Sequence, residues 1–559
     1  MLADILDAAL GAIHFTFDLW TSTNNLALLG VVGHWIAQDG TIQQGLLGLR
    51  HMEGAHTGEN QCAILWQVIE QYSLYKRIGY FTLDNAPNND VALRCLHTLL
   101  DTQGILLSLY YLCECYTNKL IGIQFDPKQR RLRCFGHIVN LVVKAFLYGK
   151  DPTAATHASD IEMSMGIEEL EDENIGSMTE TEQLLHWRRR GPYGRLRNII
   201  TFICRTPQRR EDFAKVTRET SPDIRVFAPI AANDTRWNGD FQAIKRALEL
   251  RVSLETYSVR YIRTHLRDDY LEPLDWTELE DILRILEPFH RLTLELEGRR
   301  QNGALWEVFP AMDELLNHLE TCKTTYEMTG SVHLTTSIKL AWTKLDKYYS
   351  LTEFNPVLYA AIALHPSMKM DYFNIAWDAH PAWIESAHSI IRTLWLVEYC
   401  PHFNINLPNA STTYTTEGPP CALTTSWKTK RVAKVMKDEL EEFLSLRCID
   451  VSDPRQWWVQ HQADYPALSK MALEILAIPA MSAEVERVFS SASLTVTDRR
   501  NRLGEDTIEA IECQKSWLHS GIISFSGADE MKKMLAQLQV QQQGVSIGSE
   551  PTEMVDRKG

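Results

Sequence analysis

Three acidic side chains, Asp18, Asp84 and Glu486, have the type and setting expected of ligands for a divalent cation. Asp18 closes an alternating apolar run that begins at Ile13, and Asp84 closes a second run that begins at Ile78. Such alternation is typical of a strand, and a carboxylate at the carboxyl end of a strand faces the crevice where open sheets bind ligands. Carboxylate oxygens are the ligands that Mg²⁺ prefers. The pattern therefore predicts a site for Mg²⁺ (or Mn²⁺) that Glu486 completes from far along the chain.

Each of the three acids also has a simpler structural explanation. Asp18 could cap a turn at the end of its strand, and Asp84 could be the N-cap of a helix before Pro87. Glu486 could be a first-turn acid that the helix dipole favours. Considered together with the order of the predicted strands, the three acids favour the metal site.

The first 150 residues predict a mixed five-stranded sheet with helices. The expected strands are 13–18, 26–36, 42–50, 78–83 and 131–135, and the expected helices are 59–76, 89–100 and 137–148. A three-strand meander followed by alternating helices and strands is the order of an RNase H-like fold. The predicted fold class is therefore α/β.

The rest of the chain divides by composition into four further segments. Residues 151–180 are acidic and rich in Ser and Thr, which predicts a flexible linker. Residues 181–427 have helical periodicity, with helices expected at 240–263, 276–300, 304–326, 331–350 and 354–365 and a flexible loop at 408–426. Residues 428–525 form a compact block that we expect to complete the core, and the polar tail at 526–559 is expected to be disordered.

The overall composition excludes some classes of protein. The 559 residues carry a net charge of −16, which argues against a chain that coats nucleic acid through general basicity. The 11 cysteines show no disulfide framework, which favours a reducing compartment. We expect no signal peptide and no membrane-spanning segment. The arginines between 188 and 210 form a basic cluster that we interpret as a solvated face more readily than as a binding site.

Five segments resemble, in order, the motifs of the hAT (hobo–Activator) superfamily of transposases. They are Asp18-Leu19-Trp20-Thr21-Ser22, Thr82 to Asn89 around Asp84, Arg133 to Leu141, Asp234-Thr235-Arg236-Trp237-Asn238, and the block from Tyr465 through Glu486 to Leu503. The last block resembles the family's C-terminal dimerisation region and is the strongest of the five.

The resemblance implies an RNase H-like core interrupted by a large all-α insertion, with metal-dependent cleavage and transfer of DNA strands. It gives Asp18, Asp84 and Glu486 the catalytic and metal-binding roles. It places His137, Arg236 and Trp237 at the DNA. It further implies transposon ends as the DNA partner, a homo-oligomer formed through the C-terminal region, and a nuclear location.

Several alternatives stay open at this stage. Cys134 and His137 are a single C-x-x-H pair, so a zinc site is not expected, and they could instead be a buried thiol and a hydrogen-bonded imidazole. Trp237 could be a core anchor. Family members usually carry a zinc finger before the core, and we expect none here. The alternative functions are an inactive relic that acts through dimerisation, and a single-domain nuclease that uses the same core.

Overall fold

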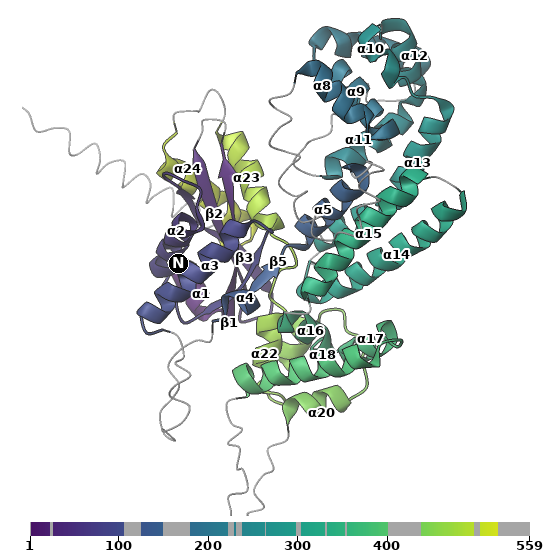
Figure 1. Ribbon diagram of the computed structural model, residues 1–559. Coiled ribbons are helices and arrows are strands. Elements are labelled where there is room, and N and C mark those ends of the chain that lie inside the picture. The colour runs from purple at the N-terminus through teal and green to yellow at the C-terminus, as the bar shows by residue number, and fades with distance from the viewer. Residues whose placement is uncertain are drawn as a thin grey trace, which may run out of the picture. The chain divides into compact units, whose positions relative to one another are not determined.

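The computed structural model describes residues 2–22, 26–105, 125–148, 179–221, 228–230, 237–262, 264–297, 303–329, 332–352, 355–400, 438–496 and 503–523 (Figure 1). The predicted linker up to residue 178, the loop at 408–426 and the polar tail at 526–559 lie outside these residues. The chain divides into two compact units. The sheet unit comprises Met1–Phe81, Pro87–Ile123 and Glu484–Gly559, and the helical unit comprises Thr82–Ala86 and Gln124–Ala483.

The described strands form a five-stranded mixed sheet in the order β3-β2-β1-β4-β5. They are β1 (Leu10–Thr21), β2 (Ala27–Ile36), β3 (Ile42–His51), β4 (Ile78–Leu83) and β5 (Arg131–Arg133). β1, β2 and β3 pair antiparallel as a meander, whereas β4 runs parallel to β1. This sheet, with helices in the rest of the described chain, confirms the predicted α/β class.

β1 is longer than the alternation of apolar residues predicts. The predicted strand ends at Asp18, but antiparallel pairing with β2 continues to the Thr21–Ala27 pair. Asp18 therefore lies inside the strand, opposite Gly30, and does not cap its end. The apolar period stops at Asp18, yet backbone hydrogen bonding carries the strand further.

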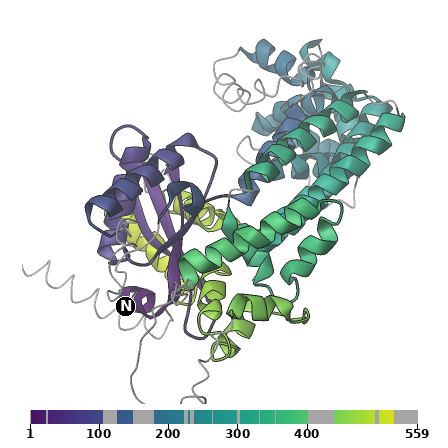
Figure 2. The ribbon, with the colours of Figure 1, turned by 60° about the horizontal axis from the view of Figure 1, so that its bottom comes forward.

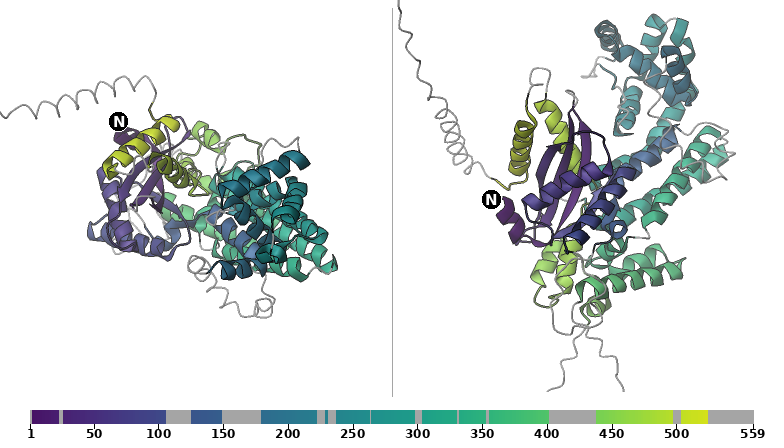
Figure 3. Two further views of the ribbon diagram at one scale, coloured as in Figure 1. Left: turned by 90° about the horizontal axis from the view of Figure 1, so that it is seen from above. Right: turned by 60° about the vertical axis from the view of Figure 1, so that its left-hand side comes forward.

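Helices cover both faces of the sheet within the sheet unit. One face packs against α2 (Gly58–Gln71) and α3 (Pro87–Thr102), and the other packs against α23 (Ala483–Thr495) and α24 (Glu505–His519) (Figure 3, right). Side chains of a strand alternate between faces. Phe15 and Phe17 contact Phe81 on one face, so Thr16, Asp18 and Trp20 project from the opposite face. The short α1 (Leu2–Ala8) precedes β1.

Helix α2 ends five residues before the predicted boundary at residue 76, because Ser73 adopts a left-handed conformation with φ of 54°. The backbone N–H of Leu74 then donates to the carbonyl of Ile69 at 2.9 Å. A left-handed residue followed by such a bond is a common way to terminate a helix. Glycine usually occupies this position, so the sequence gives no stop signal here.

A buried histidine explains the irregular register between β1 and β4. The Nδ1 atom of His14, which is fully buried, accepts a hydrogen bond from the backbone N–H of Tyr80 at 3.0 Å. A Cβ atom at Gly79 would lie 2.4 Å from this nitrogen. The imidazole thus replaces a ladder bond, and only glycine leaves it the necessary space.

The helical unit contains the remaining described helices (Figures 1 and 2). In its first part these are α4 (Pro127–Arg130), α5 (Phe135–Tyr148), α8 (Glu180–Arg188), α9 (Gly191–Cys204), α10 (Pro207–Thr220), α11 (Trp237–Glu249), α12 (Arg251–Tyr261) and the 3₁₀ turn Thr264–Asp269. They continue with α13 (Pro273–Leu296), the 3₁₀ turn Leu305–Glu307, α14 (Val308–Thr329), α15 (Val332–Thr352), α16 (Pro356–Ala363), α17 (Lys369–Ala376), α18 (Pro381–Leu394) and the π-turn Trp395–Tyr399. The last are α20 (Glu439–Ser445), α21 (Pro454–Gln460) and α22 (Leu468–Ile475).

Four long helices build the core of the helical unit. Helix α5 packs against α15, and α13 and α14 pack beside them (Figure 2). Their buried contact residues are Val142, Val143, Phe146, Ile285, Leu286, Phe289, Leu319 and Ala341. The helix predicted at 240–263 is two helices, α11 and α12, with a break at Leu250. No Gly or Pro marks that break, so the periodicity alone joins the two helices.

No helix among the described residues has the length and apolar character needed to cross a bilayer.

His34 should make the stability of the protein depend on pH. Burial lowers the pKa of His34 from 6.5 to about 3. Between pH 6.5 and about 3, the unfolded chain therefore binds a proton at His34 that the folded chain does not bind. The free energy of unfolding is then highest above pH 6.5 and decreases as the pH falls towards 3. We expect His34→Gln to remove a slope of about 1.4 kcal/mol per pH unit within this window.

The measurement is the free energy of unfolding as a function of pH for the unmutated chain and for His34→Gln. His56→Gln, at an exposed histidine of the same unit, is the control and should leave the slope unchanged. Equal slopes for the unmutated chain and His34→Gln would contradict the prediction.

Candidate active site

Asp18 projects from the sheet face that α23 covers. Asp18 lies directly opposite Gly30 in the antiparallel pair of β1 and β2, and directly opposed residues project to the same face. A Cβ atom built on Gly30 would lie 3.0 Å from side-chain atoms of both Val485 and Phe489 on α23. The carboxylate of Asp18 therefore shares its face of the sheet with the helix that carries Glu486.

An aromatic contact fixes the position of α23 along the direction of β1. Trp20, two residues after Asp18, stacks on Phe489 with ring centroids 5.9 Å apart and planes 18° apart. Phe489 is three residues after Glu486, and residues at this spacing lie on the same side of a helix. Glu486 and Asp18, both half-buried, thus lie beside the same aromatic pair.

A chain of polar side chains attaches the first turn of α23 to the sheet. Thr16 Oγ1 hydrogen bonds to His34 Nε2 at 3.1 Å, and His34 also hydrogen bonds to Gln44. Gln44 Nε2 donates to Glu484 Oε2 at 3.1 Å, and Arg487 Nη1 donates to the same oxygen at 2.6 Å. Glu484 is buried, so the sheet fixes the turn of the helix that also contains Glu486.

The local environment of Glu486 agrees with its simpler explanation, whereas that of Asp18 does not. Asp18 Oδ1 accepts a hydrogen bond from the backbone N–H of Leu19 at 2.8 Å, but Leu19 lies within β1 and not in a turn. Glu486 lies in the first turn of α23, where the helix dipole favours an acid. Neither observation conflicts with a role as a metal ligand.

In the helical unit, Asp84 begins a short turn after the end of β4. Its Oδ1 accepts a hydrogen bond from the backbone N–H of Ala86 at 3.1 Å. The guanidinium of Arg131 on β5 donates to the backbone carbonyl of Asp84 at 2.7 Å. Helix α3 begins only at Pro87, so Asp84 caps the turn before the helix and is not its N-cap residue.

The segment that leads into α23 is bound to the end of β4 within the helical unit. Thr82 Oγ1 donates to the carbonyl of Pro479 at 2.9 Å. The backbone N–H of Phe135 donates to the carbonyl of Ala480 at 3.0 Å, and that of Ser482 donates to Cys134 Sγ at 3.3 Å. Segments remote in the sequence, around Asp84 and just before Glu486, therefore meet in this unit.

The C-x-x-H pair lies at the start of α5. Cys134 is buried and accepts the bond from Ser482, as the structural interpretation predicts. His137 is half-buried, and its backbone N–H donates to the carbonyl of Cys134 at 3.1 Å. Its place at the DNA stays a prediction.

Arg236 lies outside the described residues, whereas Trp237 begins α11. The indole of Trp237 is 2% exposed and makes edge contacts with Phe241 and His290. Its burial favours the core-anchor interpretation for the chain in this conformation. Stacking on an extruded base stays a prediction and would require this ring to become uncovered.

Among the described residues, no group of three or more His, Cys, Asp or Glu side chains is gathered closely enough to hold a metal ion. Asp18 and Glu486 belong to the sheet unit and Asp84 to the helical unit. Their shared metal site thus stays a prediction. As carboxylates, all three have the oxygen chemistry that Mg²⁺ and Mn²⁺ require.

The basic cluster between residues 188 and 210 is not simply a solvated face, which corrects the prediction. Arg188 pairs with the buried Asp269 at 2.7 Å, and Arg190 is buried with its guanidinium 4.3 Å from the centre of the Trp187 ring. Arg197 lies 3.9 Å from the same ring. These arginines stabilise the helical unit through ion pairs and cation–π contacts.

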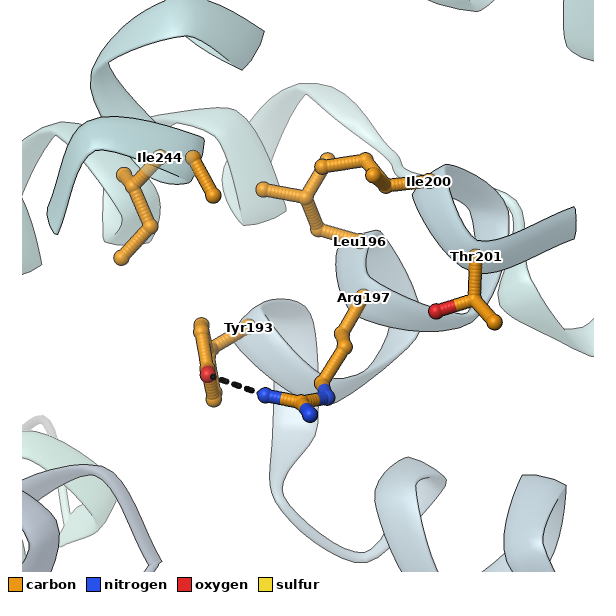
Figure 4. A pocket seen from close by; sticks show the side chains of 7 residues that line it. Tyr193, Leu196, Arg197, Ile200, Thr201 and Ile244 are labelled. Carbon is orange, nitrogen blue, oxygen red and sulfur yellow. Dashed lines mark hydrogen bonds between the residues drawn. The ribbon is translucent and has the colours of Figure 1, made fainter. Parts of the chain in front are cut away.

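Asp240 is an ion-pair partner of Arg197 that no local sequence pattern reveals. It is buried and accepts hydrogen bonds from Tyr193 at 2.6 Å and from Arg197 at 3.3 Å. Burial raises the pKa of its carboxyl. A cavity of about 10 Å³ beside Tyr193 and Arg197 is otherwise lined mainly by apolar side chains (Figure 4). A cavity of that volume holds about one water molecule, so the arrangement is structural.

Three family models match parts of the chain. The model described as "ZBED1 RNase-like domain" matches residues 16–109, and "ZBED1 RNase-like helical domain" matches residues 132–285. The model of the hAT family C-terminal dimerisation region matches residues 439–518. The match to the hAT dimerisation region agrees with the resemblance of the sequence motifs to hAT transposases. The matches to the RNase-like and helical domains also confirm the RNase H-like core with its helical insertion.

Curated proteins similar to this chain include both transposases and regulators by name. A Talaromyces stipitatus protein named "Putative transcriptional regulator tpeD" is 26% identical over 89% of this chain and 53% of its own length. A Zea mays protein named "Putative AC transposase" is 24% identical over 94% of this chain and 58% of its own length. The Arabidopsis thaliana zinc finger BED domain-containing protein DAYSLEEPER is 26% identical over 53% of this chain and 42% of its own length. The chain thus spans little more than half the length of the first two relatives.

Because α23 packs directly on the backbone of Gly30, we expect an added methyl group at this position to destabilise the protein. The Cβ of Gly30→Ala would lie 3.0 Å from Val485 and Phe489, so we expect α23 to shift outward and the protein to lose about 1–3 kcal/mol of stability. Hydrogen exchange of the α23 amides should accelerate.

Gly504→Ala is the matched control, because a Cβ there meets nothing within 4 Å and its φ is −67°. This variant should leave exchange in α23 unchanged. Unchanged hydrogen exchange of the α23 amides in Gly30→Ala would show that the packing of α23 does not require glycine at that position.

Proposed function

We propose that this chain acts as a metal-dependent DNA transposase, or as part of one, with Asp18, Asp84 and Glu486 as its catalytic carboxylates. The observation that carries the proposal is the seating of α23 on the face of the sheet from which Asp18 projects. This seating brings Asp18 and the helix that carries Glu486 to one face of the sheet unit, and carboxylates are the ligands that Mg²⁺ prefers.

The proposed reaction is hydrolysis of a DNA phosphodiester followed by strand transfer. Two Mg²⁺ ions, when bound, activate the attacking oxygen and stabilise the leaving oxygen. Asp18 and Glu486 would hold them from one face of the sheet. Asp84 directly follows β4, which is parallel to β1, and parallel strands present their carboxyl ends at one edge. We therefore propose Asp84 as the third ligand.

The proposed DNA partner is the set of transposon ends, in the nucleus. His137, at the start of α5, would contact the phosphate near the cleaved bond, and Arg236 and Trp237 would contact the extruded base or its phosphate. Relatives named for a transposase and for a transcriptional regulator support an encounter with DNA.

We further propose that the chain forms a homo-oligomer through its C-terminal region. The inward stripe of α23 and α24, which includes Val485, Phe489 and Ile508, is already buried against the sheet. A partner must therefore use other side chains of the region. Leu494 on α23 is 78% exposed, and it is the first candidate.

An inactive relic that acts through dimerisation is the second candidate function. It is favoured by the match to the dimerisation region at residues 439–518, which requires no catalysis. The relative named as a transcriptional regulator also supports it. The two candidates differ in cleavage but share self-association.

Cleavage can be tested on supercoiled plasmid carrying the DNA that flanks the gene. We expect nicking in Mg²⁺ or Mn²⁺, none with chelator, and a loss of at least about 100-fold in Asp18→Asn, Asp84→Asn and Glu486→Gln, because each removes a ligand charge. The measurement is the rate of conversion to nicked circles.

Asp90→Asn, at an exposed acid on α3, is the control and should retain the unmutated rate. No nicking by the unmutated chain at high concentrations of protein and DNA would leave the relic function. Equal nicking by all four variants would refute the three named ligands.

Self-association can be tested with Leu494→Glu. A buried charge at a contact should weaken the dimer by at least about tenfold, or ~1.4 kcal/mol, measured by sedimentation equilibrium. Leu185→Glu, at a 49% exposed position on α8, is the control. Equal dissociation constants for both variants would place the contact elsewhere.

A further inference from the structure

We propose that Arg131 and Arg133 of β5 are positioning residues that hold the turn Asp84–Ala86 in one conformation and so fix the orientation of the Asp84 carboxylate. This inference rests on the proposed role of Asp84 as a metal ligand. It concerns side chains that neither the motif containing Asp84 nor the three-carboxylate pattern includes. All the residues involved belong to the helical unit.

Arg131 binds the backbone of the turn at two points. Its side chain is buried, with 5% of the residue exposed. Its Nη2 donates to the carbonyl of Asp84 at 2.7 Å and lies 3.4 Å from the carbonyl of Ala86. Because one planar group serves both carbonyls, the Asp84–Asn85 and Ala86–Pro87 peptide planes cannot rotate independently.

Arg133 holds the middle residue of the same turn. Its Nη1 donates to the side-chain oxygen of Asn85 at 2.6 Å. The backbone N–H of Cys134 donates to the carbonyl of Leu83 at 2.8 Å and so continues the ladder between β4 and β5. Every residue from Leu83 to Ala86 thus has a hydrogen bond that restrains it.

The restraint reaches the carboxylate through the backbone. Asp84 Oδ1 accepts from the backbone N–H of Ala86 at 3.1 Å, so the orientation of that N–H sets the orientation of the carboxylate. Mg²⁺ demands nearly ideal octahedral geometry, and ligands must be held within about 0.5 Å of it. A turn with free rotation would present Asp84 in many orientations.

Arg130 provides a matched comparison on the adjacent residue. It is also buried, but its Nη2 pairs with Glu398 Oε2 at 2.7 Å. Glu398 lies in the π-turn Trp395–Tyr399, so this ion pair is with that segment rather than with the turn at Asp84. A loss of stability through removal of a buried cation should therefore appear in Arg130→Met, whereas a loss of carboxylate positioning should appear only at Arg131 and Arg133.

The first experiment measures hydrogen exchange at the amide of Ala86 in the full chain. We expect about tenfold faster exchange in Arg131→Met, a smaller increase in Arg133→Met, and the unmutated rate in Arg130→Met. Arg131→Lys retains the charge but cannot serve both carbonyls with one planar group, so its rate should be intermediate. Unchanged exchange in both Arg131 variants would overturn the proposal. If Arg131→Met does not fold, Arg131→Lys and Arg133→Met decide the question.

The second experiment measures Mn²⁺ binding and the Mn²⁺ concentration that gives half-maximal plasmid nicking. We expect about tenfold weaker binding and a tenfold higher half-maximal concentration in Arg131→Met, with Arg130→Met unchanged. Equal Mn²⁺ affinity in Arg131→Met and the unmutated chain would refute the positioning role and leave the proposed function intact. Failure of the unmutated chain to bind Mn²⁺ or to nick DNA would instead refute the proposed function, and exchange at Ala86 would still decide whether the arginines hold the turn.

Discussion

The seating of α23 on bare backbone at Gly30 is the contact on which the arrangement of the sheet unit depends. Val485 and Phe489 approach the strand so closely that a Cβ atom would lie 3.0 Å from each. The same contact buries an apolar face of the sheet that includes Leu28, Val32 and Leu46, and such burial contributes about 25 cal/mol per Å². A helix from the end of the chain thereby becomes part of the core, and Glu486 is brought to the face that carries Asp18.

Buried polar contacts give this seating its register. Apolar packing alone tolerates sliding, because hydrophobic contact has no direction. The series of hydrogen bonds from Thr16 through His34 and Gln44 to Glu484 can form in only one placement of α23. A shift of the helix would leave buried donors and acceptors without partners, which costs about 1–3 kcal/mol for each group. Polar side chains inside the core therefore specify where the proposed ligand lies.

The C-terminal region serves two structural purposes before any association with a second chain. Its helices α20, α21 and α22 belong to the helical unit, and α23 and α24 cover the sheet. Between them, the segment Pro479–Ser482 binds the end of β4 and the start of α5. Most apolar residues of its periodic stripes are thus part of a folded core. The proposed self-association would therefore use exposed side chains, such as Leu494.

The sequence by itself determined the strand order, the α/β class and the stripe of α23, because apolar periodicity is a local property of the chain. It also predicted Asp18, Asp84 and Glu486 as ligands, from the ends of two apolar runs and from the motifs that contain them. Tertiary structure alone decided that Asp18 lies inside a strand opposite Gly30, that Asp240 and Trp187 hold the arginines, and that Trp237 is covered. These outcomes depend on partners remote in the chain. No local pattern records such partners, because each contact forms only when packing brings the two segments together.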